Sequence, residues 1–121
     1  MRLPGHVESL DDDVRRTADL NVLYAASLEF GTNWLRPVAE LAVERLTGTT
    51  PEYRTELVGV VQKCKAAVEK YIEREYSLKG DAGDSECAAA AHQWISERYP
   101  WMSRRNRQHA ISQGIYYAWH G

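Results

Sequence analysis

The strongest constraint on how this chain can fold is a long helical pattern in residues 51–76. Thr50 can cap a helix, Pro51 suits the first helical position, and Glu52 is compatible with the helix dipole. Such a helix would extend about 39 Å, so we expect it to be the central element against which the others pack. Its apolar side chains recur at alternating intervals of four and three residues: Tyr53, Leu57, Val60, Cys64, Ala67 and Tyr71. Val61, Val68 and Ile72 lie beside this stripe.

Two further helices are predicted before this one. After a lead-in arm at residues 1–8, Ser9 is the expected N-cap of the first helix, and Gly31 is its stop signal. A second helix follows, with Thr32 or Asn33 as its cap and Pro37 near its first turn, and it ends at Gly48. The expected inner face of the first helix consists of residues spaced three and four apart: Val14, Ala18, Asn21, Ala25 and Leu28. Leu20, Leu23 and Tyr24 widen this face. On that face, Asn21 indicates a buried hydrogen bond rather than catalysis.

Two more helices are predicted after a loop at residues 77–84, which contains two glycines and no apolar period. Ser85 is the expected cap of a fourth helix that ends at Arg98. Pro100 then favours a turn, and Ser103 caps a fifth helix. No segment shows the alternating apolar pattern of a strand, so we predict an all-α bundle of about five helices.

Length and composition fit one soluble domain covering residues 1–121. Apolar residues make up 44% of the chain and charged residues 26%, which excludes wholesale disorder. No stretch is long and apolar enough to cross a bilayer, and the first residues lack the pattern of a signal peptide. Two cysteines are too few for a disulfide scaffold, so we expect a reduced, cytoplasmic protein.

Charge and aromatic residues are concentrated at the C-terminal end. The whole chain has a net charge of −2, whereas residues 99–121 contain three arginines and no carboxylate. Six of the twelve aromatic residues lie in the last 28 positions. Arginine combined with tyrosine and tryptophan is the composition enriched at the energetic centres of protein interfaces. This end of the chain is therefore the candidate binding region.

The preferred hypothesis is a non-enzymatic helical module that binds another protein, such as an adaptor, a regulatory subunit or an inhibitor of the immunity or antitoxin type. An aromatic anchor would be buried on the partner, and arginines would steer toward an acidic patch. A homodimer is compatible with the same pattern. The expected partner-binding residues are Trp101, Arg104, Arg105, Arg107 and Tyr116. Tyr116 is expected to be exposed, whereas Tyr117 and Trp119 flank the apolar stripe of the last helix and are expected to complete the core.

Two alternatives account for the same arginines. The outline helix, turn, helix at residues 86–119 is that of a nucleic-acid reader, with Arg104, Arg105 and Arg107 at the start of the second helix. Alternatively, the arginines pair within the molecule, with the aspartates at 11–13 or with the acidic segment 81–86. The acidic remainder of the chain argues against strong nonspecific attraction to nucleic acid.

Motifs for metal or cofactor binding are absent from the sequence, and we expect neither a metal nor a cofactor. His109 and His120 share a helical face but lie about 16 Å apart along it, too far to hold one ion. An enzyme assembled from scattered groups such as Glu29, Glu40 and His92 is the least favoured hypothesis.

Overall fold

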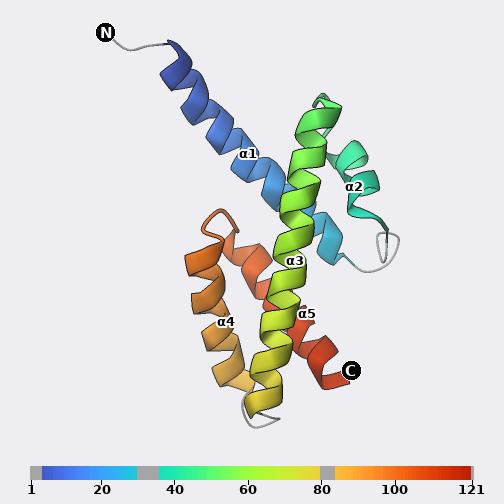
Figure 1. The fold of residues 1–121 in the computed structure, drawn as a ribbon, viewed down its shortest axis with the longest axis vertical. Coiled ribbons are helices and arrows are strands. Elements are labelled where there is room, and N and C mark those ends of the chain that lie inside the picture. The colour runs from blue at the N-terminus through green and yellow to red at the C-terminus, as the bar shows by residue number, and fades with distance from the viewer. Residues whose placement is uncertain (1–3, 30–35, 80–83, 121) are drawn as a thin grey trace.

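The computed structural model describes residues 4–29, 36–79 and 84–120, with side-chain detail for 11–29, 36–78 and 85–119. These residues form an all-α bundle without strands, and the central position belongs to α3 (Figure 1). This confirms the predicted fold class. The five helices of the described ranges are α1 (Pro4–Leu28), α2 (Val38–Arg45), α3 (Pro51–Lys79), α4 (Asp84–Arg98) and α5 (Arg104–His120).

Helix α3 begins as the sequence predicts. The Thr50 hydroxyl oxygen accepts a hydrogen bond from the backbone N–H of Tyr53 at 3.2 Å, and Pro51 is the first helical residue. The helix then continues through residues 77–79, which were predicted to belong to a loop. Apolar spacing stops before these residues, but exposed backbone can stay helical without it. The rest of that predicted loop lies largely outside the described residues.

The buried face of α3 is rotated from the predicted stripe. Leu57 and Cys64 are buried as expected, whereas Tyr53, Val60 and Tyr71 are only half-buried. Helices pack on several sides of α3, so the line of deepest burial is set by its neighbours rather than by its own period. The fully buried side chains along it are Leu57, Val61, Cys64, Val68 and Ile72.

Helix α1 differs most from its prediction. It begins at Pro4, so residues 4–8 are helical rather than an arm, and Ser9 lies inside the helix instead of capping it. Proline at the first helical position is a stronger start signal here than serine. The first half of α1 extends past the other helices in Figure 1, and Val14 is 71% exposed. The predicted inner face is therefore wrong at Val14 and Ala18, both of which are exposed.

The second half of α1 is buried in the bundle. Leu20, Leu23 and Tyr24 are inaccessible to solvent. The Tyr53 hydroxyl donates a hydrogen bond to the Asp19 carboxylate at 2.7 Å, which joins α1 to the start of α3. Burial and this carboxylate raise the pKa of Tyr53 to about 12.

The remaining boundaries are close to prediction. Pro37 is the N-cap of α2, one residue before the helix, and Gly48 lies in the following turn with a positive φ of 79°. Helix α4 begins at Asp84, one residue before the expected cap Ser85, and ends at Arg98 as predicted. The N-cap of α2 is thus Pro37 and not the predicted Thr32 or Asn33, which lie outside the described residues, as does the predicted stop at Gly31.

Candidate functional site

The amide side chain of Asn21, on α1, forms hydrogen bonds with the turn between α4 and α5. Asn21 donates from Nδ2 to the Trp101 carbonyl oxygen at 2.8 Å and to the Thr17 carbonyl oxygen at 3.0 Å. Its Oδ1 accepts a hydrogen bond from the backbone N–H of Ser103 at 2.7 Å. The hydrogen-bonding role predicted for Asn21 is therefore confirmed, and the network fixes where α5 begins.

A second amide, Asn106, completes this joint. Its Nδ2 donates to the Asn21 carbonyl oxygen at 2.9 Å and to Asn21 Oδ1 at 3.0 Å. The backbone N–H of Asn106 donates to the Ser103 hydroxyl at 3.1 Å, which confirms Ser103 as the cap of α5. Asn106 is only 5% exposed. Asn106 was not predicted from the sequence, although its spacing of four and seven residues from Ala110 and Gln113 places all three on one face.

Gln113 fastens the other end of α1. Its Nε2 donates to the Leu28 carbonyl oxygen at 2.8 Å, and Lys65 Nζ donates to the Ser27 carbonyl oxygen at 3.1 Å. The last carbonyl groups of a helix lack partners within that helix, so these bonds satisfy two of them. Gln113 is thus buried, whereas His109 and Tyr116, four residues before it and three residues after it on α5, are exposed.

Trp101 is half-buried within a chain of aromatic rings. Its ring lies 6.0 Å from that of Tyr24 and 6.3 Å from that of Tyr99, edge to face in both cases. Tyr99 in turn meets Trp94, which stacks on Tyr71 at 4.4 Å. Edge-to-face and stacked pairs are favourable beyond the area they bury. Trp101 therefore contributes to packing, and only part of its surface remains available to a partner.

The three arginines occupy two environments. Arg104 and Arg105 are exposed, and Arg107 is half-buried with its Nε donating to His92 Nδ1 at 3.2 Å. Within the part of the chain that has side-chain detail, ion pairs join Arg16 to Glu56, Arg36 to Glu44 and Arg45 to Glu29, and none involves these three arginines. The predicted pairing with residues 11–13 is therefore not formed. Residues 81–83 lie outside the described part.

His92 is held neutral by its surroundings. Partial burial lowers its pKa below the usual value of 6.5, and the nearby charges of Arg107 and Arg104 lower it further. A neutral imidazole with an unprotonated Nδ1 can accept the Arg107 hydrogen bond, whereas an imidazolium could not. His92 therefore positions Arg107 at physiological pH.

The solvent-facing side of α5 is a continuous strip, called here the outer face of α5. Tyr116 is 54% exposed, in agreement with the prediction. Trp119 is 61% exposed, which corrects the expectation that it completes the core. Tyr117 is half-buried as expected. The outer face consists of six exposed residues, none acidic: Arg105, Gln108, His109, Ser112, Tyr116 and Trp119.

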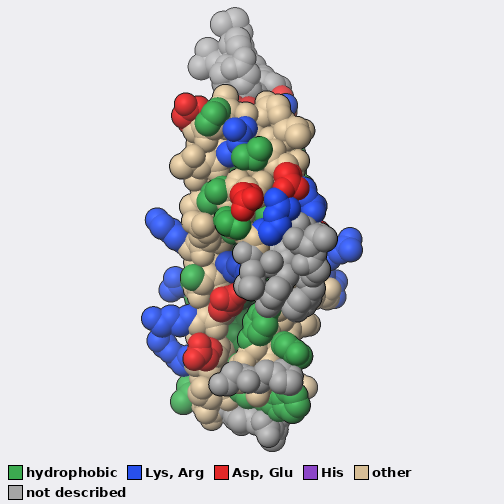
Figure 2. All heavy atoms as spheres, turned by 90° about the vertical axis from the view of Figure 1, so that its right-hand side faces the viewer, with side chains coloured by type: hydrophobic (Ala, Val, Ile, Leu, Met, Phe, Trp, Pro, Cys, Tyr) green, Lys and Arg blue, Asp and Glu red, His purple; other side chains and the backbone are tan. Residues whose placement is uncertain are grey.

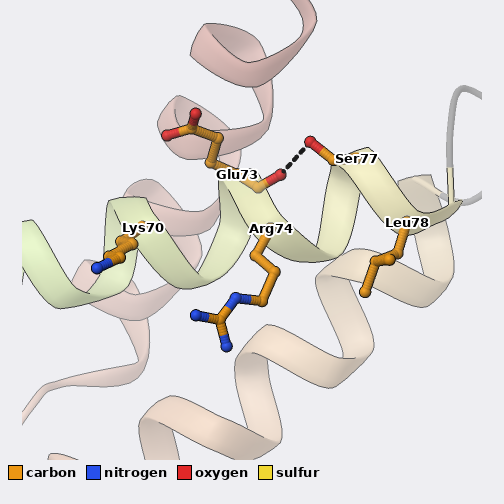
Figure 3. A pocket seen from close by; sticks show the side chains of 5 residues that line it. All are labelled: Lys70, Glu73, Arg74, Ser77 and Leu78. Carbon is orange, nitrogen blue, oxygen red and sulfur yellow. Dashed lines mark hydrogen bonds between the residues drawn. The ribbon is translucent and has the colours of Figure 1, made fainter.

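Elsewhere the surface carries charges of both signs. On the face shown in Figure 2, acidic and basic side chains are interspersed along the molecule. A hollow of about 380 Å³ on α3 has the same mixed character, because Lys70 and Arg74 line it together with Glu73, Ser77 and Leu78 (Figure 3). The Glu73 side chain points away from Arg74, and the Ser77 hydroxyl is engaged with the Glu73 carbonyl oxygen at 2.9 Å. All five residues are exposed and come from one helix, so the hollow is open rather than enclosed.

The two thiols are buried and unsuited to nucleophilic chemistry. Burial raises the pKa of Cys64 to about 12, although the nearby Tyr24 hydroxyl acts in the opposite direction. Cys87 is fully buried and lies 3.9 Å from the Ile72 carbonyl oxygen. Within the described ranges, no three His, Cys, Asp or Glu side chains are grouped so that they could hold a metal ion.

Two of the groups named for an enzyme have local partners: Glu29 accepts a hydrogen bond from Arg45, and His92 accepts one from Arg107. None of the described helices has both the length and the apolar character needed to cross a membrane.

Comparison with known proteins returns no matching family model, no matching curated protein and no matching solved structure.

Proposed function

We propose that this protein binds another protein through the outer face of α5 and the adjoining α4–α5 turn. The observation that carries the proposal is the pairing of two exposed aromatic rings, Tyr116 and Trp119, with exposed arginines on a helix that has no carboxylate. Aromatic and arginine side chains supply most of the binding energy at protein interfaces. An adaptor, a regulatory subunit or an inhibitor could act sterically through such a surface.

The joint with α1 supports this role. Asn21 and Asn106 hold the start of α5 in one orientation, so the outer face is presented by a fixed helix. A preformed surface loses less conformational entropy on binding than a mobile one. The accessible part of Trp101 lies in the turn before the helix, and Arg107, held by His92, lies in its first turn, so both adjoin the N-terminal end of this surface.

We also propose that the protein is located in the cytoplasm. Cys64 and Cys87 are both buried thiols that form no disulfide, and thiols persist most readily in a reducing compartment.

The test is affinity capture from a lysate of the source organism with quantitative identification of bound proteins. The variant Arg104→Glu/Arg105→Glu and the variant Tyr116→Ser/Trp119→Ser should each lose a partner that the unaltered protein retains. The matched control is Lys70→Glu/Arg74→Glu, which makes the same charge change on the exposed side of α3. Identical sets of proteins captured by all four chains would refute the proposal. Light scattering at two concentrations shows whether the partner is a second copy.

Nucleic-acid binding is a second candidate, favoured by one observation. The outer face offers Arg105 and Gln108, both hydrogen-bond donors able to reach base edges, in the position of a recognition helix. If this function holds, affinity for a DNA duplex falls with salt, and the Arg104→Glu/Arg105→Glu variant has a shallower salt dependence. If the protein does not bind a DNA duplex even at about 50 mM salt, the nucleic-acid-binding function is rejected.

A further inference from the structure

The outer face of α5 has two chemically different ends. Arg105, with Arg104 beside it, lies at the N-terminal end, where the helix dipole adds further positive potential. Tyr116 and Trp119 lie at the C-terminal end. Arg105 and Tyr116 are separated by eleven residues, which is about three turns or 16 Å along the axis. A ligand that uses both ends must therefore match two requirements at a fixed distance.

The residues in the middle of the outer face are polar. Ser112 is the smallest of its exposed side chains, and it lies between the arginine end and the aromatic end. A small residue at this position lets a second helix approach closely along the strip. An eleven-residue interval on a partner helix spans the same 16 Å, so its side chains would come into register with both ends.

From this arrangement we propose that the partner segment is an amphipathic helix with acidic side chains at one end and apolar side chains about three turns away. The inference rests on the proposed protein-binding function and names the chemistry of its partner. Charge complementarity supports it, because α5 has three arginines and no carboxylate, and neither Arg104 nor Arg105 forms an ion pair with the described side chains. Carboxylates pair with arginine in a two-bond geometry that also sets register.

The probes are fluorescein-labelled helical peptides, whose dissociation constants are measured by fluorescence anisotropy against the intact protein. The reference peptide has two glutamates eleven residues from a Leu-Phe pair. A second peptide replaces both glutamates by glutamine, and a third shortens the interval to five residues, which suits an extended strand. We expect the second and third peptides to bind at least about tenfold more weakly, the loss produced by one or two interface contacts.

Charge exchange makes the test specific. The Arg104→Glu/Arg105→Glu variant should bind the reference peptide at least about tenfold more weakly and recover affinity for a peptide with lysines in place of its glutamates. The Lys70→Glu/Arg74→Glu control should bind the reference peptide as the unaltered protein does. Equal binding of the acidic and glutamine peptides, tighter binding of the five-residue peptide, or no binding of any peptide at millimolar concentration overturns the inference.

The two proposals fail in different ways. If a host protein is captured through Tyr116 and Trp119 but no peptide shows acid dependence, the protein-binding function stands and the acidic helical partner is wrong. If the capture experiment shows no partner that depends on the outer face and the peptides do not bind, both proposals fall.

Discussion

Helices α3 and α5 differ in the side chains that they bury. Along α3 the deepest positions are apolar, such as Leu57 and Ile72, and the charged residues face solvent. Along α5 the buried positions include the amides of Asn106 and Gln113, while Tyr116 and Trp119 face solvent. The difference shows that α3 is stabilised chiefly by apolar contact, whereas the position of α5 also depends on specific hydrogen bonds.

This contrast explains why α5 carries the candidate site. A helix held partly by directional bonds to Asn21 and Leu28 can keep its aromatic residues outside and still have a defined orientation. Exposed aromatic side chains on such a helix are available for a partner without loss of the fold.

The largest effect is expected from breaking the joint that orients α5. Asn21→Ala should lower the free energy of unfolding by about 2–3 kcal/mol, because partly buried donors and acceptors on the α4–α5 turn lose their partners. Chemical denaturation followed by circular dichroism measures it. The exposed Gln62→Ala on α3 is the control. A loss no larger than that of the control would mean that apolar contacts alone orient α5.

Trp101 and Tyr116 should separate packing from binding. Trp101→Ala should lower the free energy of unfolding by about 2 kcal/mol, because it removes a half-buried ring that contacts Tyr24 and Tyr99. Tyr116→Ala should change it by less than about 0.5 kcal/mol, as exposed positions generally do. Thermal melts of both variants provide the comparison. A destabilised Tyr116→Ala would show that the outer face is part of the core.

The close packing of α3 against α5 can be tested by substituting alanine for each of two glycines. A Cβ at Gly114 would lie 2.7 Å from Ile72 Cδ1 and 3.3 Å from Ile72 Cγ2, whereas a Cβ at Gly59 meets nothing within 4 Å. Gly114→Ala should therefore lower stability by about 1 kcal/mol, since overpacking outweighs the gain in helix propensity. Gly59→Ala should raise stability by about 0.5–1 kcal/mol. Stabilisation by both substitutions would mean that α5 yields readily to the added methyl group.

The smallest effect concerns pH. Because the pKa of His92 in the folded protein lies below 6.5, the unfolded chain takes up a proton first as the pH falls. Stability from neutral His92 is present above pH 6.5 and decreases as the pH drops through the lowered pKa. His92→Gln, which can still accept a hydrogen bond from Arg107, should reduce this dependence. Unfolding measured between pH 5 and 8, around the ordinary histidine pKa, checks it; identical pH profiles would contradict the role of His92.

Of the two amide side chains that join α1 to α5, only Asn21 could be predicted from the sequence. Asn21 stood out because a polar residue interrupts an apolar period, and its hydrogen bonds follow. Asn106 did not stand out, because it lies among arginines at the start of α5, where polar residues are expected on any face. The exposure of Trp119 was missed for the converse reason, since an apolar ring next to an apolar stripe is predicted to be buried.

The sequence by itself determined which segments are helical and where several of them begin, because caps, prolines and apolar spacing act within a few residues of one another. Thr50, Pro51 and Ser103 are examples. Only the tertiary structure decided which face of each helix is covered, since that depends on neighbours far away in the chain. As a result, Val14 is exposed, and the buried face of α3 differs from the predicted stripe. On α5, two amide side chains, of Asn106 and Gln113, are buried, whereas the rings of Tyr116 and Trp119 are exposed.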